Sequence, residues 1–122
     1  MAANGAKVNL QQKYGKFTDR WSAKILAQIN EMQLKAVKIK GEFVWHSHPE
    51  TDEMFLVHKG RMVMRLRDGD VTLDAGELYV VPRGVEHCPF AEEECEVLLL
   101  EPVGTANTGD AGGARTVEPE WI

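Results

Sequence analysis

GELYVVPRGVEH, residues 76–87, is the stretch that decides the fold. Its apolar run, Leu78–Val81, has the length and the β-branched content of a short strand. Pro82-Arg83-Gly84 follows as a tight turn, because proline presets φ and glycine accepts a positive φ. His87 then stands where the next strand is expected to begin. The stretch therefore predicts a strand, a turn and a histidine at the start of a second strand.

Short apolar or alternating segments of the same kind run from residue 34 to residue 101, each closed by a turn signal. Helical periodicity is weak over this region, which favours an all-β domain. The expected strands are Leu34–Lys40, Phe43–His48, Glu53–Lys59, Arg61–Arg67, Asp70–Leu73, Leu78–Val81, His87–Phe90 and Cys95–Glu101. Eight short strands in series predict a sandwich or a closed barrel.

The segment that precedes this region, residues 21–40, fits two structures. It can be an amphipathic helix, or two strands joined near Asn30-Glu31. The alternation of Ile25, Ala27 and Ile29 favours the strands.

The chain is thus expected to have three parts. Residues 1–33 form an N-terminal β extension, packed on the barrel or on a dimer partner, and residues 34–103 form the barrel. Residues 104–122 hold four glycines and little apolar material, which predicts a loosely packed arm whose end is anchored by Trp121.

Length and composition narrow the class of protein. The chain has 122 residues, 43% of them hydrophobic and 27% charged, which suits one globular domain without disulfides. The net charge is -5 and basic residues are scattered, so nucleic acid is not an expected partner. No apolar stretch is long enough to span a bilayer, and the first fifteen residues do not have the pattern expected of a secretory signal, so we expect a cytoplasmic protein with reduced cysteines.

The residues best suited to binding a metal or to catalysis are histidines and a glutamate. His46 and His48 are one residue apart, so in a strand they share a face, whereas Trp45 and Ser47 point the other way. After the loop that Pro49 starts, Glu53 begins the next strand. The His-x-His pair alone is weak evidence for a metal site, since surface and core histidines are common. His87 adds a third imidazole.

The stretch from Gly41 to Gly60 and the stretch from Gly76 to Ala91 resemble the paired signature motifs of the cupin superfamily. The resemblance is in particular to its small single-domain members of the cupin 2 type, which are mannose-6-phosphate isomerase-like. The matching positions are Gly41, His46, His48, Glu53 and Gly60 in the first motif, and Gly76, Pro82, Gly84 and His87 in the second. Four residues separate Gly41 from His46 where the common form has five, and Ala91 replaces a frequent asparagine. Neither departure touches a ligand position.

The resemblance implies a jelly-roll barrel with one divalent metal ion bound by His46, His48, Glu53 and His87. Imidazole and carboxylate donors suit Zn, Fe, Mn or Ni, and they do not choose among these metals. Such a cupin is expected to be a metal-dependent enzyme with a small organic or sugar-derived substrate, either isomerase-like or dioxygenase-like. The alternative is a non-catalytic module that binds a small molecule or a metal. Small cupins often form homodimers.

Other residues receive secondary interpretations. Met62 and Met64, together with Phe90, are expected to line the substrate pocket if their strand faces the barrel interior. Strand alternation directs His58 and Cys88 away from the metal. Phe43 and Trp45 are likewise expected on the face away from it. No lysine or further carboxylate is placed by the sequence as a general base.

Overall fold

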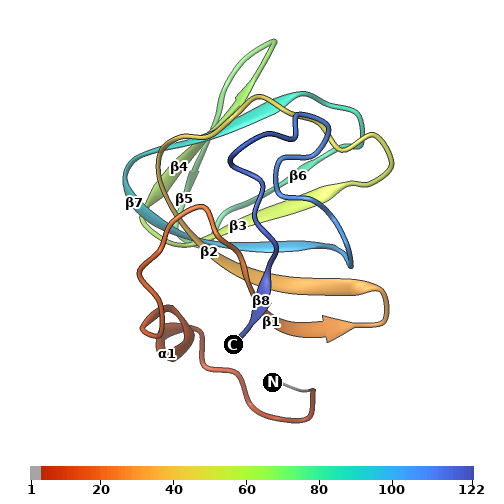
Figure 1. Ribbon diagram of the computed structural model, residues 1–122. Coiled ribbons are helices and arrows are strands. Elements are labelled where there is room, and N and C mark those ends of the chain that lie inside the picture. The colour runs from red at the N-terminus through yellow and green to blue at the C-terminus, as the bar shows by residue number, and fades with distance from the viewer. Residues whose placement is uncertain (1–3) are drawn as a thin grey trace.

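The structure is a computed structural model that describes residues 4–122 (Figure 1). Its elements in chain order are α1 (Leu10–Tyr14), β1 (Lys24–Ile29), β2 (Met32–Glu42), β3 (Glu53–Lys59), β4 (Arg61–Leu66), β5 (Val71–Asp74), β6 (Leu78–Val81), β7 (His87–Pro102) and β8 (Glu120–Trp121). Apart from the single short helix these are all strands, which confirms the prediction of an all-β jelly-roll domain.

The long strand β7 organises the barrel. Near its start it pairs with β4, with Leu66 opposite His87. Further along it lies between β2 and β3 and pairs antiparallel with both, Leu99 being opposite Lys35 on one side and Phe55 on the other. Strand β6 pairs with the outer edge of β3, and β1 with the outer edge of β2. Strand β7 thus pairs with three of the other strands, β2, β3 and β4.

The turns explain why neighbouring strands pair as they do. The hairpin between β1 and β2 closes over Asn30-Glu31, with Ile29 opposite Met32. Asn30 has φ 53, a left-handed conformation that asparagine tolerates better than most residues. The prediction of two strands in this region is therefore correct, and the helical alternative is wrong.

The expected strand Phe43–His48 does not form. Strand β2 ends at Glu42, and the segment that follows makes only one isolated bridge, between His46 and His87. The Phe43 amide donates to the Pro89 carbonyl at 3.0 Å, but proline has no N–H with which to continue the ladder. Pairing resumes at His46 in a register shifted by one residue. Phe43 is consequently turned to the same side as His46.

The two strands expected over His87–Phe90 and Cys95–Glu101 are parts of one strand, β7. The acidic residues between them, Glu92, Glu93 and Glu94, lie within the strand and are exposed. Between the pairs Ile39↔Cys95 and Gly41↔Ala91, one residue of β2 faces three of β7, so this bulge lets the acidic run reach solvent.

Two apolar clusters stabilise the domain. The larger fills the barrel interior and includes Val57, Met62 and Met64, all fully buried. The smaller lies outside the barrel, where Tyr14 and Phe17 of the N-terminal segment pack against residues of β1, β2 and β7. Helix α1 belongs to this second cluster. Its five residues are too few for a clear helical period, which is why the sequence pattern does not predict it.

The C-terminal arm is irregular and follows the surface of the barrel. Figure 1 shows it, in blue, lying over the barrel and returning to β1, where Trp121 pairs with Ile25 in parallel β8. Thr108 within the arm is fully buried. The anchoring of the arm at Trp121 agrees with expectation, and most of the arm is exposed, as a loosely packed segment would be, except around Thr108. Within residues 4–122, no helix has the length and apolar character that crossing a membrane would need.

Candidate metal centre

The four expected ligands come from three places in the chain and meet at one end of the barrel. His46 and His48 lie in the irregular segment after β2, Glu53 is the first residue of β3, and His87 is the first residue of β7. The backbones of His46 and His87 exchange two hydrogen bonds, 3.0 and 2.9 Å, which place the two histidines directly opposite each other. The one isolated bridge in this segment therefore fixes the first ligand against the last.

The donor atoms of these side chains converge. One ligand atom from each of the four lies within 4.8 Å of all the others, and all four residues are buried. The ring centroids of His46 and His87 are 4.3 Å apart, and those of His46 and His48 are 5.1 Å apart. The structure thus brings together the full set that the sequence suggested.

Backbone carbonyls determine which nitrogen of two histidines faces the centre. The Nδ1 atoms of His46 and His87 lie 2.8 and 2.9 Å from the carbonyl oxygens of Val44 and Val85. A carbonyl only accepts, so Nδ1 carries the proton, and Nε2 of the neutral ring presents its lone pair. Hydrogen bonding of this kind orients metal-binding histidines in general.

The arrangement fits a metal ion better than it fits direct contacts between side chains. Glu53 Oε1 lies 3.2 Å from His48 Nε2 and 3.3 Å from His87 Nε2, and His48 Nε2 is buried without a hydrogen-bond partner in the described residues. Lone pairs facing a carboxylate repel unless a cation lies between them. Bonds of about 2.1 Å to one ion would separate neighbouring donors by about 3.0–3.4 Å, which matches the two distances from Glu53 Oε1.

The ionisation states agree with this donor set. Burial would raise the pKa of Glu53, but in the metal-free protein hydrogen bonds with His48, His87 and Glu101 outweigh burial and hold the pKa below its usual range. Burial, aided by the nearby His87, lowers the pKa of His46 to about 4. An ionised carboxylate and a neutral imidazole are the forms that bind divalent metals.

Two charged residues next to the centre were missed by the sequence analysis. Lys35 and Glu101 face the barrel interior from β2 and β7, and their ion pair spans 3.1 Å with both side chains nearly inaccessible. Burial and the adjacent Glu53 carboxylate raise the pKa of Glu101, and Lys35 opposes this. The missed signal was alternation, since Glu101 shares a strand face with the core residues Val97 and Leu99.

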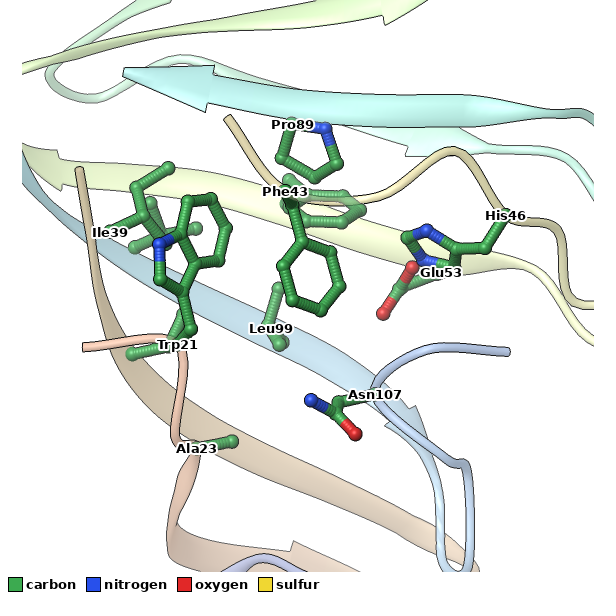
Figure 2. A pocket seen from close by; sticks show the side chains of 12 residues that line it. Trp21, Ala23, Ile39, Phe43, His46, Glu53, Pro89, Leu99 and Asn107 are labelled. Atoms are coloured by element: carbon green, nitrogen blue, oxygen red, sulfur yellow. The ribbon is translucent and has the colours of Figure 1, made fainter. Parts of the chain in front are cut away.

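A largely apolar cavity opens beside the centre. It is small, with a volume of about 50 Å³, and it is partly open to solvent. It is lined by Trp21, Ala23, Val37, Ile39, Phe43, His46, Glu53, Phe55, Pro89, Val97, Leu99 and Asn107. In Figure 2 the stacked rings of Trp21 and Phe43 stand on one side, and His46 and Glu53 lie beyond Phe43. Phe43 was expected to face away from the metal, and the register shift explains why it does not.

The residues expected to bind substrate lie elsewhere. Met62 and Met64 are fully buried in the core cluster, and Phe90 lies under the Arg65 guanidinium at 4.3 Å. None of the three is among the residues that line the cavity. A role for them in binding substrate stays a prediction, while Trp21, Phe43 and Asn107 are new candidates for that role.

The remaining side chains follow the alternation rule. His58 lies away from the centre, stacked on Tyr14 with ring centroids 5.2 Å apart. Its Nδ1 lies 3.0 Å from a Glu96 carboxylate oxygen. Cys88 and Cys95 are buried free thiols, as expected.

Comparison with known proteins identifies the family. The family model for the cupin domain matches residues 34–101, more than half of the chain, so the protein belongs to the cupin family. The comparisons do not show the mannose-6-phosphate isomerase-like subgroup. The matched range nearly coincides with the barrel expected over residues 34–103, and the N-terminal segment and the C-terminal arm lie outside it.

Solved structures place it among small cupins. A cupin-2 domain protein from Shewanella frigidimarina is 47% identical and superimposes with a TM-score of 0.77 over 78% of this chain and 93% of that one. Protein NMB1881 from Neisseria meningitidis is 31% identical, with a TM-score of 0.74 over 80% of this chain and 99% of that one.

A curated relative is the uncharacterized protein YdbB of Bacillus subtilis (strain 168). It is 29% identical over 63 residues, which make up 51% of this chain and 56% of that protein. The match thus spans little more than half the length of this relative.

Proposed function

We propose that this cupin is a metal-dependent enzyme that binds one divalent ion at the three histidines and Glu53 and acts on a small organic molecule with an apolar body. The observation that carries the proposal is the cavity wall, which is apolar except where it reaches His46, Glu53 and Asn107. A small molecule in this cavity would be desolvated by aromatic rings at one end and would reach the proposed metal-binding residues at the other. This is the usual construction of a small-molecule site.

The lining favours dioxygenase-like chemistry over isomerisation of a sugar phosphate. No lysine or arginine is among the residues that line the cavity, so its wall offers no cation to a phosphate group, although the Arg115 guanidinium packs on the rings of Phe43 and Trp21, 4.7 and 5.3 Å from their centroids. When bound, Fe, Mn, Ni or Zn would supply a Lewis acid, and Fe would also supply the means to activate oxygen. A dioxygenase reaction consumes one O₂ and leaves both oxygen atoms in the product.

The residues of the chain have separable roles in this proposal. Trp21, Phe43 and Phe55 hold the apolar body of the substrate and exclude water from the centre. Asn107 provides a polar side chain on the cavity wall; its amide bonds to the backbones of Arg115 and Val117, which leaves one N–H and one oxygen lone pair for a polar substituent of the substrate. Hydrogen bonds to the Nδ1 atoms of His46 and His87 keep the donor atoms pointed inward.

The first experiment separates a metal site from a chance cluster. Elemental analysis of protein purified without added metal is compared with the His46→Ala, His48→Ala double variant. We expect about one equivalent of a divalent metal in the parent protein and much less in the variant. Equal and negligible metal in both would contradict the proposal.

The second experiment separates an enzyme from a binding module. Oxygen uptake is followed for the iron-loaded protein with catechols and β-diketones, small molecules with adjacent oxygen donors on an apolar body, and sugar phosphates are tested for isomerisation. With the catechols and β-diketones, both oxygen atoms of ¹⁸O₂ should be found in the product. A cavity variant, Ala23→Leu, tests whether turnover takes place in this cavity. The larger side chain narrows the cavity away from the proposed metal-binding residues, so the variant should keep the metal and turn over more slowly. Binding of these compounds without turnover would favour the non-catalytic module.

A further inference from the structure

The segment that contains His46 and His48 is held from two sides. On the barrel side, His46 pairs with His87, and the His48 carbonyl accepts a hydrogen bond from the Gly84 amide at 2.9 Å. On the other side lies the C-terminal arm, residues 104–122. Ser47, the residue between the two histidines, is the point at which the arm makes contact.

Asp110 binds Ser47 through three hydrogen bonds. The Ser47 amide donates to Asp110 Oδ1 at 2.7 Å, and the Ser47 hydroxyl donates to Oδ2 at 3.0 Å. In return, the Asp110 amide donates to the Ser47 carbonyl at 3.0 Å. Both backbone groups of Ser47 are therefore paired, as a neighbouring strand would pair them, although the segment is irregular. The position of the residue between the two proposed ligands is fixed by this contact.

Gly109 allows the arm to approach this closely. Its φ is +53, and a Cβ added there would lie 2.3 Å from the Ser47 carbonyl oxygen and 3.0 Å from His46 Cδ2. Any other residue would push the arm off Ser47 and against the His46 ring. The backbone of the arm thus packs directly behind one of the proposed ligands.

The arm is itself well supported. The Asn107 side chain donates to the Arg115 carbonyl and accepts from the Val117 amide, at 2.9 and 3.0 Å, which closes the arm on itself. Fully buried Thr108 lies next to Gly109, and β8 ties the end of the arm to β1. The arm is therefore a folded support. It also lies outside the region that matches the cupin domain.

We infer that Asp110 and Gly109 are positioning residues of the metal centre, which hold His46 and His48 in place by fixing Ser47. This inference rests on the proposed binding of a metal by those histidines. Residues that orient metal ligands typically change metal affinity by about 10-fold to 100-fold when they are removed. Asp110 and Gly109 are expected to behave in this way even though neither contacts the metal.

The test uses Co(II) as the probe and the full-length chain. The dissociation constant for Co(II) is measured by competition with a chromophoric chelator, and the visible spectrum of bound Co(II) reports the ligand geometry. The variants are Asp110→Ala, Asp110→Asn, which keeps an acceptor for the Ser47 amide, and Gly109→Ala. The matched control is Glu118→Ala, because Glu118 lies in the same arm and has no ion pair or side-chain hydrogen bond within residues 4–122.

We expect Asp110→Ala to weaken Co(II) binding by about 10-fold to 100-fold and to alter the spectrum. Asp110→Asn should recover most of the affinity, Glu118→Ala should match the parent, and Gly109→Ala should resemble Asp110→Ala. Parent affinity and an unchanged spectrum in Asp110→Ala would overturn the inference, even if its thermal midpoint were lower. If Gly109→Ala does not fold, the comparison of Asp110→Ala with Asp110→Asn tests the inference without it. Failure of the parent protein to bind Co(II) would instead contradict the proposed function.

Discussion

The buried pair of Lys35 and Glu101 allows a quantitative test of how the charged groups at one end of the barrel affect the free energy of unfolding. Its side chains are 2% and 3% exposed, and the Nζ–Oε1 distance is 3.1 Å. At an effective dielectric constant of about 20, two full charges at this distance would attract by about 5 kcal/mol, and desolvation together with the raised pKa of Glu101 offsets much of it. Glu53 lies beside Glu101, so Lys35 compensates a pair of carboxyl groups.

Removing only the cation should therefore be costly. Lys35→Met keeps most of the aliphatic stem but leaves the carboxyl pair buried without its counter-charge, and breaking a buried pair in this way costs about 3–5 kcal/mol. This is a large part of the total stability of a domain of this size, about 5–15 kcal/mol. In the Lys35→Met, Glu101→Leu double variant both charges are gone, and we expect stability within about 1 kcal/mol of the parent protein.

The assay is urea unfolding of the metal-free proteins in chelator at pH 7, followed by circular dichroism. With a slope of about 1–3 kcal/mol per molar urea, the Lys35→Met midpoint should fall by at least about 1 M. The reasoning is refuted if Lys35→Met loses less than about 1 kcal/mol. It is also refuted if the double variant loses the sum of the two single losses, because the two charges would then be independent.

Three further predictions concern the metal, the core and a thiol. Added Zn(II) at about 100 times its dissociation constant should stabilise the protein by about 2.7 kcal/mol, and His87→Ala should abolish the gain; equal melting temperatures with zinc and with chelator would contradict this. Met64→Ala should cost about 2–5 kcal/mol in urea unfolding because the side chain is fully buried, and a loss below 1 kcal/mol would show that the core can collapse around it. Burial, with a smaller effect of Glu96, raises the pKa of Cys95 to about 12, so less thiolate exists at any given pH than in the unfolded chain. Iodoacetamide at pH 8 should accordingly modify Cys95 about a thousandfold more slowly in the native protein than in urea, and equal rates by mass spectrometry would refute it.

The sequence by itself determined the class of fold and predicted the four residues that meet in the candidate metal centre. Strand alternation, together with turns such as Asn30-Glu31 and Pro82-Arg83-Gly84, predicted most strands, and the expected bounds of β3 and β6 agree with those observed. These signals are local, so a single chain shows them. The four candidate ligands could be predicted because they stand in short motifs at fixed offsets from prolines and glycines.

Only the tertiary structure decided what surrounds the ligands. Pro89 interrupts pairing with the segment after β2, and the resulting one-residue shift turns Phe43 into the cavity, which alternation along an unbroken strand could not predict. Glu101 meets Lys35 across 66 positions of sequence, and Asp110 meets Ser47 across 63. Contacts of this kind depend on register, bulges and the path of the arm. These are set by the packing of the whole barrel, whereas the periodicity and turn chemistry that a sequence displays extend over only a few residues.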